Sequence, residues 1–470
     1  MTFSRISLLL PVLLLGACTM TPRYQQPALA VSDAWPVTPG GTATPVGDSL
    51  SWQAVFHDER LQRVISRALD NNRDLRVAVL NIQKARSSYR MTRASLLPSL
   101  NANLGESHSL TPASVSGTGS AIKADAYSAE LSVPAWELDL FGRVQSQTKS
   151  AFETYLATNE TRRAAQVSLI SETAAAWLTL GADQDLLKLA QSTLQTREDT
   201  LKLTQRTFAL GTASQTDLHN DEILTEQARA DVAQFQAQVN QDKDALTLLA
   251  GSAVPDADLP DGLPGDDAIA TTLPSGLPSQ VLTRRPDVLA AEHTLKAANG
   301  DIGAARAAFF PSISLTGSTG SESTELGHLF DAHTGAWSFT PAISLPIFAG
   351  GYNIANLQNA KTSRDIAVAQ YDKAVQTAFK DVADALAVRA TIEDRLEAAR
   401  KVAAASDDNL KLEQARYQRG VDSYLDQLDA QRTDYSAQQA AISVRLLRDA
   451  NLVTLYGALG GGSGPETSPK

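Results

Sequence analysis

One stretch, from Gly351 to Gly420, constrains the fold most, because its pattern predicts a single very long helix. Apolar residues recur at steps of three and four, with charged and polar residues opposite, at Val368, Tyr371, Val375, Phe379, Val382 and Leu386. About 70 residues would form a helix of roughly 100 Å, whereas an average helix has about 11–12 residues. Charges throughout exclude a membrane span, which needs about 18 or more consecutive apolar residues.

The chain contains this pattern twice. Gly142–Gly211 has the same length, and after each long helix a short turn leads into a returning helix that ends near Leu249 or Leu455. We therefore expect two long helical hairpins, over 142–250 and 351–457. Each return arm is shorter than its partner, and in the first hairpin residues 71–96 would make up the difference if they stacked on its end.

Matching landmarks lie about 210 residues apart, which is too long for a solenoid unit of roughly 20–50 residues. Asp74 corresponds to Asp287, Pro98 to Pro311 and Gly211 to Gly420. The sequence therefore predicts one molecule of two similar structural repeats, 53–251 and 284–460, joined by a linker over 252–283. A flexible tail is expected over 461–470.

The N-terminus has the layout of an export signal. Arg5 precedes a short apolar run, Leu8–Leu15, which is too short to cross a bilayer. Leu15-Gly16-Ala17-Cys18 then resembles a bacterial lipobox, so we expect a signal peptide over 1–17 and palmitate-type lipidation of Cys18. The alternative is a plain signal peptide with an incidental Cys. Residues 18–52, rich in Pro, Thr, Gly and Ser, are expected to form a lipid-anchored extended tether.

Each repeat also contains two short segments in which apolar and small polar residues alternate. They lie at about 98–108 and 125–135, and again at about 311–321 and 336–346. Alternation with period two predicts strands, and strands of roughly ten residues with one polar face suit a transmembrane β-barrel. A half-buried hairpin in a soluble sheet has the same alternation. Pro98, Pro311, Pro134 and Pro346 are expected where strand and helix meet.

Four strands are too few for one chain to close a barrel in lipid, because an open sheet edge cannot lie in hydrocarbon. Sharing between chains solves this, and three copies would supply twelve strands, whereas two would supply only eight and leave a filled interior.

Composition narrows the function classes. The net charge of −11 argues against nucleic acid as a partner. A single Cys cannot form an intrachain disulfide, and six scattered His make a metal site unexpected. We find no nucleophile–His arrangement, no GxSxG and no phosphate loop, so no catalytic residues and no cofactor are expected.

Several stretches resemble the TolC-type outer membrane efflux proteins, specifically the lipidated OprM-like branch that serves resistance–nodulation–division pumps. They span the mature chain in order: the lipobox at Cys18, NNRDLRVA at 71–78, YRMTRASLLPSL at 89–100, WELDLFGR at 136–143, RRPDVLAAE at 284–292, GAARAAFFPSISLTG at 303–317, LPIFAGG at 345–351 and GVDSYLDQLDAQR at 420–432.

The resemblance implies a mainly α fold with a membrane β-barrel. It implies a homotrimer whose twelve-stranded β-barrel, with four strands per chain, continues into a twelve-helix periplasmic α-barrel. The implied partners are a periplasmic adaptor (membrane fusion) protein, an inner-membrane pump and outer membrane lipid. The implied function is a passive exit duct for toxic compounds or drugs, and hence a role in antibiotic resistance.

Two groups of residues are candidate sites. The turns between hairpin arms should be adaptor-docking tips as well as helix caps, because Gly tolerates positive φ and Ser suits an N-cap; they comprise Gly211, Thr212, Ser214, Gly420, Asp422 and Ser423. Beside the second turn, the resemblance implies a periplasmic gate of Leu425, Asp429 and Arg432, with Asp426 as an additional acid. A solvated acidic helix face would have the same sequence.

Two rival functions remain open from the sequence alone. One is a periplasmic coiled-coil structural or adaptor lipoprotein without a pore, and the other is an exported enzyme, for which no site is evident. The sequence does not specify the exported compounds. Only Met20 and Met91 remain after processing, which favours organic compounds over soft metal ions.

Overall fold

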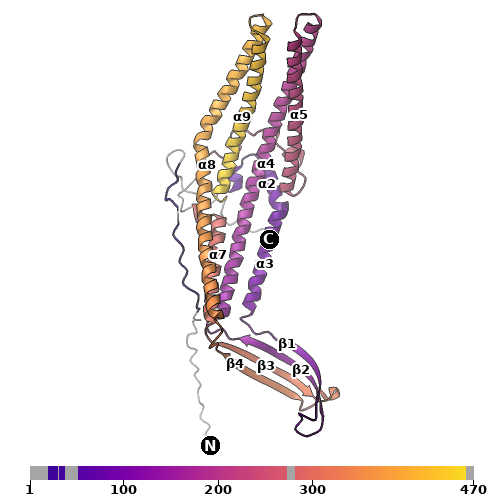
Figure 1. Cartoon of the computed structure of the whole chain (residues 1–470), viewed down its shortest axis with the longest axis vertical. Helices are drawn as coiled ribbons and strands as arrows, with labels where there is room; N and C mark the ends of the chain where they lie inside the picture. Colours follow the sequence, from indigo (N-terminus) through magenta and orange to yellow (C-terminus); the bar gives the residue numbers. More distant parts are fainter. Residues whose placement is uncertain (1–18, 30, 38–50, 272–280, 462–470) are drawn as a thin grey trace. The chain divides into compact units, whose positions relative to one another are not determined.

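The computed structural model describes residues 19–29, 31–37, 51–271 and 281–461. Its main helices and strands, all but the short α1, are labelled in Figure 1. In chain order they are α1 (Trp52–Val55), α2 (Glu59–Asn71), α3 (Arg73–Ala94), β1 (Asn101–Thr111), β2 (Ile122–Glu137), α4 (Arg143–Ala209), α5 (Gln215–Ala250), α7 (Pro286–Ala307), β3 (Ser312–Ser323), β4 (Gly335–Ser344), α8 (Tyr352–Gln418) and α9 (Tyr424–Ala458).

The chain divides into two compact units. Of the described residues, the first comprises 19–27, 82–158 and 291–371, and the second comprises 28–29, 31–37, 51–81, 159–271, 281–290 and 372–461. The first contains all four strands of the sheet, and the second contains most of both hairpins. Within the described residues, no helix combines the length and the hydropathy that crossing a membrane requires.

The strands of the first unit form one antiparallel sheet in the order β1-β2-β3-β4 (Figure 1). The ladders run past the stretches of clear alternation, so that β1 ends at Thr111 and β2 begins at Ile122. Backbone pairing needs no apolar pattern, which is why the polar segment around residue 110 still pairs. The expectation for Pro134 was wrong: it lies inside β2, where the register shifts between Val133 and Trp136. Proline is tolerated at such a bulge because no ladder hydrogen bond is lost there.

The two hairpins, α4/α5 and α8/α9, lie side by side in the second unit (Figure 1). Each long helix has 67 residues. Their main core is covered by α1 and α2 and is centred on Trp177, Phe56 and Tyr456. Trp177 is fully buried and its indole N–H donates to the carbonyl of Asp258 at 3.0 Å. An indole can be buried at this depth because its one polar group has a partner.

The return helices end against the starts of other helices through equivalent contacts in the two repeats. Asn72 caps α3, since its side chain accepts from the backbone of Leu75, and it also donates to the carbonyl of Leu249 at the end of α5. In the second repeat, Arg285 precedes α7 and donates to the carbonyl of Ala458, at the end of α9, at 2.7 Å. Each side chain thus satisfies a helix-terminal carbonyl that lacks an intrahelical partner.

The described part of the expected tether is extended but held in place. In the first unit, Asn299 donates to the carbonyl of Pro22, and the hydroxyl groups of Thr21 and Ser146 lie 3.0 Å apart. In the second unit, Trp35 is buried and stacks on Phe379 with ring centroids 5.0 Å apart. This stretch therefore lies along each unit as a strap.

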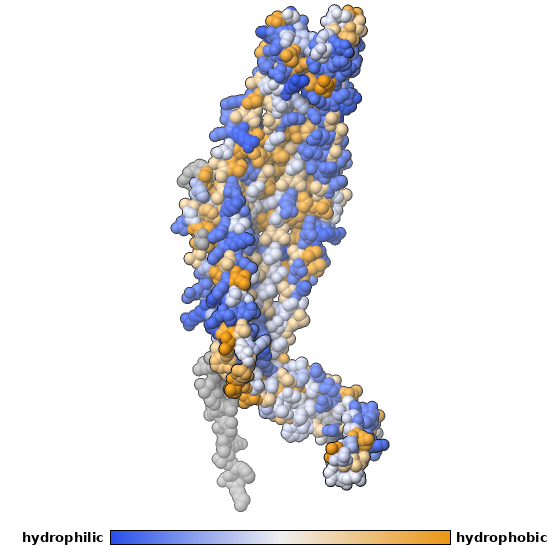
Figure 2. Space-filling model, viewed as in Figure 1, coloured by the Kyte–Doolittle hydropathy of each residue, from blue (hydrophilic) through white to orange (hydrophobic). Residues whose placement is uncertain are grey.

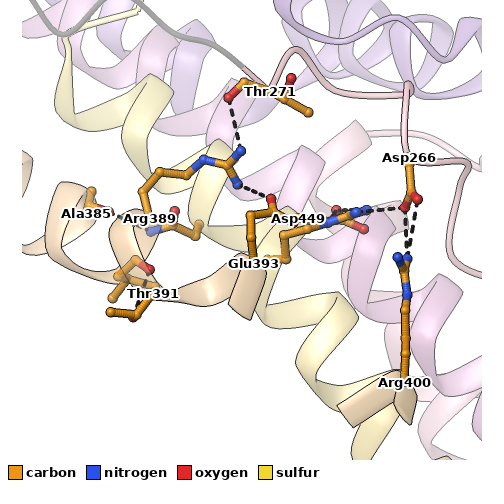
Figure 3. Close-up of polar contacts among 11 residues, drawn as sticks. Asp266, Thr271, Ala385, Arg389, Thr391, Glu393, Arg400 and Asp449 are labelled. Atoms are coloured by element: carbon orange, nitrogen blue, oxygen red, sulfur yellow. Dashed lines mark hydrogen bonds and ion pairs between the residues drawn. The ribbon is translucent and has the colours of Figure 1, made fainter. Parts of the chain in front are cut away.

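The described part of the segment between the repeats is also packed on the helices of the second unit. Asp266 accepts from two arginines, Arg400 of α8 at 3.3 Å (Figure 3) and Arg448 of α9 at 2.7 Å. Arg389 donates to the carbonyl of Thr271 (Figure 3). Opposite charge on the helices and the segment accounts for this attachment, together with burial of Leu259 and other apolar residues.

Candidate functional site at the hairpin tips

Each hairpin turns at a glycine with left-handed backbone geometry. Gly211 has φ +76° and Gly420 has φ +70°, and a Cβ added to either would meet open space. The glycine is therefore required by backbone conformation rather than by crowding. In the first turn, the Thr212 hydroxyl also donates to the carbonyl of Thr207, which caps the end of α4.

The return helices begin with the same capping box in both repeats. Ser214 caps α5 with Asp217 as its reciprocal partner, and Ser423 caps α9 with Asp426. Each box satisfies backbone N–H groups that the first helical turn leaves without partners. Asp426, which the sequence suggested as an additional gate acid, is thus engaged in ending the turn.

Asp422 is fixed to the preceding helix. Its carboxylate accepts from the guanidinium of Arg416 in α8, which lowers the pKa of Asp422. Glu413 also hydrogen-bonds to Asp422, and this contact raises the pKa of Glu413. The second tip is therefore an ordered polar turn in which the predicted docking residue Asp422 joins α8 to the N-terminus of α9.

The three residues implied as a gate share one face of α9. Leu425, Asp429 and Arg432 follow steps of four and three and are all exposed, with Leu425 at 66%. Asp426 lies about a quarter turn away from that face. Within the described residues of the chain, neither Asp429 nor Arg432 forms an ion pair. Their charges are thus available to another molecule.

Sequence reasoning missed the contacts that join the two hairpins behind this face. The Tyr424 hydroxyl donates to the buried carboxylate of Asp221, and Tyr435 donates to Asp231 at 3.0 Å. Burial, followed by the hydrogen bond to Asp221, raises the pKa of Tyr424. Arg197 lies over the Tyr435 ring, 5.4 Å from its centroid. The signal was two tyrosines on one face of α9, but their partners are some 200 residues earlier in the chain.

The structure thus defines a class: a chain of two repeats, each with a pair of strands and a very long helical hairpin ending in a capped polar tip. The family model described as "Outer membrane efflux protein" matches residues 64–252 and 277–461. The chain belongs to this family.

Named relatives cover nearly the whole chain. The probable efflux pump outer membrane protein TtgC of Pseudomonas putida is 46% identical over 466 residues, covering 98% of this chain and 96% of that protein. The outer membrane protein OprJ of Pseudomonas aeruginosa is 43% identical over 457 residues, covering 97% and 95%. The crystal structure of the open state of the Neisseria gonorrhoeae MtrE outer membrane channel has a TM-score of 0.86 and 42% identity, covering 96% and 100%.

The expectation of a lipidated Cys18 falls outside the described residues. The described chain begins at Thr19, next to that position, and the strap that follows is held on the first unit by Asn299 and Ser146.

Proposed function

We propose that three copies of this chain form an outer membrane exit duct of a tripartite efflux pump. The duct passively conducts small toxic compounds or drugs that an inner-membrane pump and a periplasmic adaptor deliver to it. The names of the relatives support this function, since TtgC is described as an efflux pump protein and MtrE as an outer membrane channel. The duct would conduct passively and catalyse no reaction, and the pump would supply the energy.

The sheet is the single observation that carries the proposal. In the described residues, β1 and β4 each pair on one side only, so both outer edges of the sheet carry unpaired backbone groups. Such edges are tolerated in lipid only if they pair with another strand. Since β1 and β4 run in opposite directions, β4 of one copy can pair antiparallel with β1 of the next. Three copies then close a twelve-stranded barrel.

The surface of the strands supports a lipid environment. Large hydrophobic side chains are exposed on both outer strands, with Leu104 at 84% and Trp337 at 79%. On the helices, the visible face carries hydrophobic side chains among hydrophilic ones (Figure 2). Extended exposed apolar surface on a single chain indicates a lipid or subunit interface. Palmitate on Cys18 would add a second attachment to the membrane.

Two further parts of the duct are proposed on the hairpins. The tips would dock the adaptor, and the gate would be the α9 face that carries Leu425, Asp429 and Arg432. The ordered turns around Gly211 and Gly420 present capped helix ends to an adaptor, which would dock helices against them. In a trimer, Leu425 and Asp429 each form a threefold ring. An apolar constriction with a ring of carboxylates would narrow the periplasmic end and favour cations.

The proposal is tested with the full mature protein in planar bilayers. A heat-stable trimer and low closed-state conductance are expected for the wild type. The Leu425→Ala/Asp429→Ala variant should raise conductance several-fold, since it removes both rings. The Leu412→Ala/Asp408→Ala variant on α8 is a matched control with the same spacing and exposure and should conduct as the wild type does.

Two outcomes would contradict this function. A water-soluble monomer without conductance would instead support a coiled-coil structural or adaptor lipoprotein. A conducting trimer whose closed-state conductance is unchanged in the double variant would keep the duct but remove these residues from its gate.

A further inference from the structure

A groove of about 660 Å³ lies between α4, α8, α9 and the start of α7 in the second unit. This volume is within the roughly 300–1,000 Å³ of sites for drug-sized molecules. Small and apolar side chains form most of the walls, among them Ala164, Val167, Ala385, Val388, Leu447 and Ala450. The groove can therefore receive an apolar body of moderate size.

The groove and the main core lie on opposite faces of α9. Leu452, Val453 and Tyr456 belong to the core that α1 and α2 cover. Leu447, Ala450 and Thr454 line the groove, and at 100° per residue they lie about half a turn from that core face. In the proposed duct we place the extra layer formed by α1 and α2 on the outside of the wall. The groove then opens toward the bore.

The lining is acidic. It contains the carboxylates of Asp287, Asp381 and Asp384 against one cation, Arg285. That guanidinium is engaged within the protein: it donates to Asp287, to Asp381 at 3.2 Å, and to the carbonyl of Ala458. Within the described residues, the ion pair of Asp384 is with Lys380, an exposed neighbour on the same helix, and such a pair contributes little. The net charge of the lining therefore favours a cation.

A buried acceptor in the lining has no partner. Asn451 is only 5% exposed, and its side-chain N–H donates to the carbonyl of Ala385 at 3.0 Å. Its Oδ1 atom has no hydrogen-bond partner in the described structure, and neither does the hydroxyl of Ser171, another lining residue. A buried acceptor without a partner is costly, so a ligand that brings an N–H donor to this point would gain affinity.

We propose that this groove is a binding site, in the wall of the duct, for organic cations with an apolar body and an N–H donor. The proposal rests on the duct function above and specifies a class of compound that contacts the wall during passage. The apolar walls hold the body, the carboxylate of Asp384 holds the charge, and Oδ1 of Asn451 accepts from the donor.

The test uses the purified mature trimer in nanodiscs at low salt, with ethidium as the fluorescent probe and an anionic naphthalenesulfonate dye for comparison. Ethidium carries a fixed positive charge, an aromatic body and amino donors. Anisotropy should show saturable binding of ethidium and none of the anionic dye at this site. Asp384→Asn should weaken ethidium binding about fivefold, as expected for one partly screened charge at contact distance.

Two variants complete the test. Ser168→Trp places an indole into the groove from an exposed position of α4 and should abolish saturable binding. Asp394→Asn, on α8 outside the lining, makes the same charge change as Asp384→Asn and should leave binding unchanged. Conductance of each preparation is measured in parallel. A conducting trimer that binds no ethidium, or binds it equally in all variants, overturns the groove proposal alone. Loss of trimer and conductance in the wild type would overturn the duct itself.

Discussion

Asp242 on α5 gives the sharpest prediction, because its carboxyl group is partly buried next to that of Asp183. Burial, then a hydrogen bond to Asp183 and repulsion from it, raises the pKa of Asp242 to about 7. Its Oδ2 atom is buried and has no hydrogen-bond partner among the residues that the structure describes. Two adjacent carboxyl groups in such a setting share one proton at neutral pH or below. Replacing Asp242 with Asn supplies a permanent N–H donor to Asp183 without a titrating charge.

The sign and size of the effect follow from linkage. The unfolded chain loses this proton near pH 3.8 and the folded chain near pH 7. Stability from this group is therefore complete below about pH 4, falls as the pH rises to about 7, and stays constant above that. Each pH unit corresponds to about 1.4 kcal/mol, which sets an upper bound of about 4 kcal/mol. Asp242 is only partly buried, so solvent screening reduces this to about 1 kcal/mol.

Thermal unfolding of the detergent-solubilised protein at pH 5.5, 6.5 and 8 measures the effect. The Asp242→Asn variant should lose less stability than the wild type between pH 5.5 and 8. At pH 8 its midpoint should be higher, by on the order of 1–2 °C for about 1 kcal/mol in a chain of this size. Asp244→Asn, an exposed position on the same helix, should follow the wild type. If Asp242→Asn shows the wild-type pH dependence, the shared proton does not exist.

Two further predictions concern local order. Ser423→Ala should remove the cap of α9 and cost about 1 kcal/mol of stability. Amide exchange over Tyr424–Gln427 should become faster, whereas Ser436→Ala, an exposed control on the same helix, should leave it unchanged. Unchanged exchange in Ser423→Ala would mean that the cap is dispensable. Gly303→Val should dislodge the strap, because a Cβ there would lie 2.3 Å from the Thr21 hydroxyl. Trypsin should then cut faster after Arg23, whereas Gly327→Val, which meets open space, should have no such effect; equal cleavage would contradict the close fit.

The hairpins could be predicted from the sequence because their information is local. Helical spacing, proline-free length and a Gly-x-x-Ser turn specify two long helices and their caps without reference to any other segment. The strands were also recognisable, although backbone pairing extends β1 to Thr111 and accommodates Pro134 at a bulge.

The missing information concerned contacts between distant segments. The sequence predicts Asp426 as an additional gate acid, whereas its carboxylate forms the capping box of α9 with Ser423. An exposed acid and a capping acid have the same residue type, so composition alone does not separate the two roles. Tyr424 and Asp221, and Arg285 and Ala458, are far apart in the sequence. Periodicity identifies the buried face of each helix but does not specify which polar group on another helix meets it.

The internal repeat explains why one site offers a groove and the other a shared proton. Asp242 and Asn451 are separated by the same number of residues as Gly211 and Gly420, so they occupy equivalent positions on the two return helices. The carboxyl group of Asp242 hydrogen-bonds to Asp183, whereas Oδ1 of Asn451 has no partner in the described part of the chain. Likewise, Asn72 and Arg285 make the same contact with a helix end, but only the arginine reaches on to Asp381 in the groove. In both repeats the side chain donates a hydrogen bond to the carbonyl at the end of a return helix, so this position requires a donor. The rest of the side chain is not restricted by this hydrogen bond, and here the repeats differ in charge, since Asn72 is neutral and Arg285 is cationic.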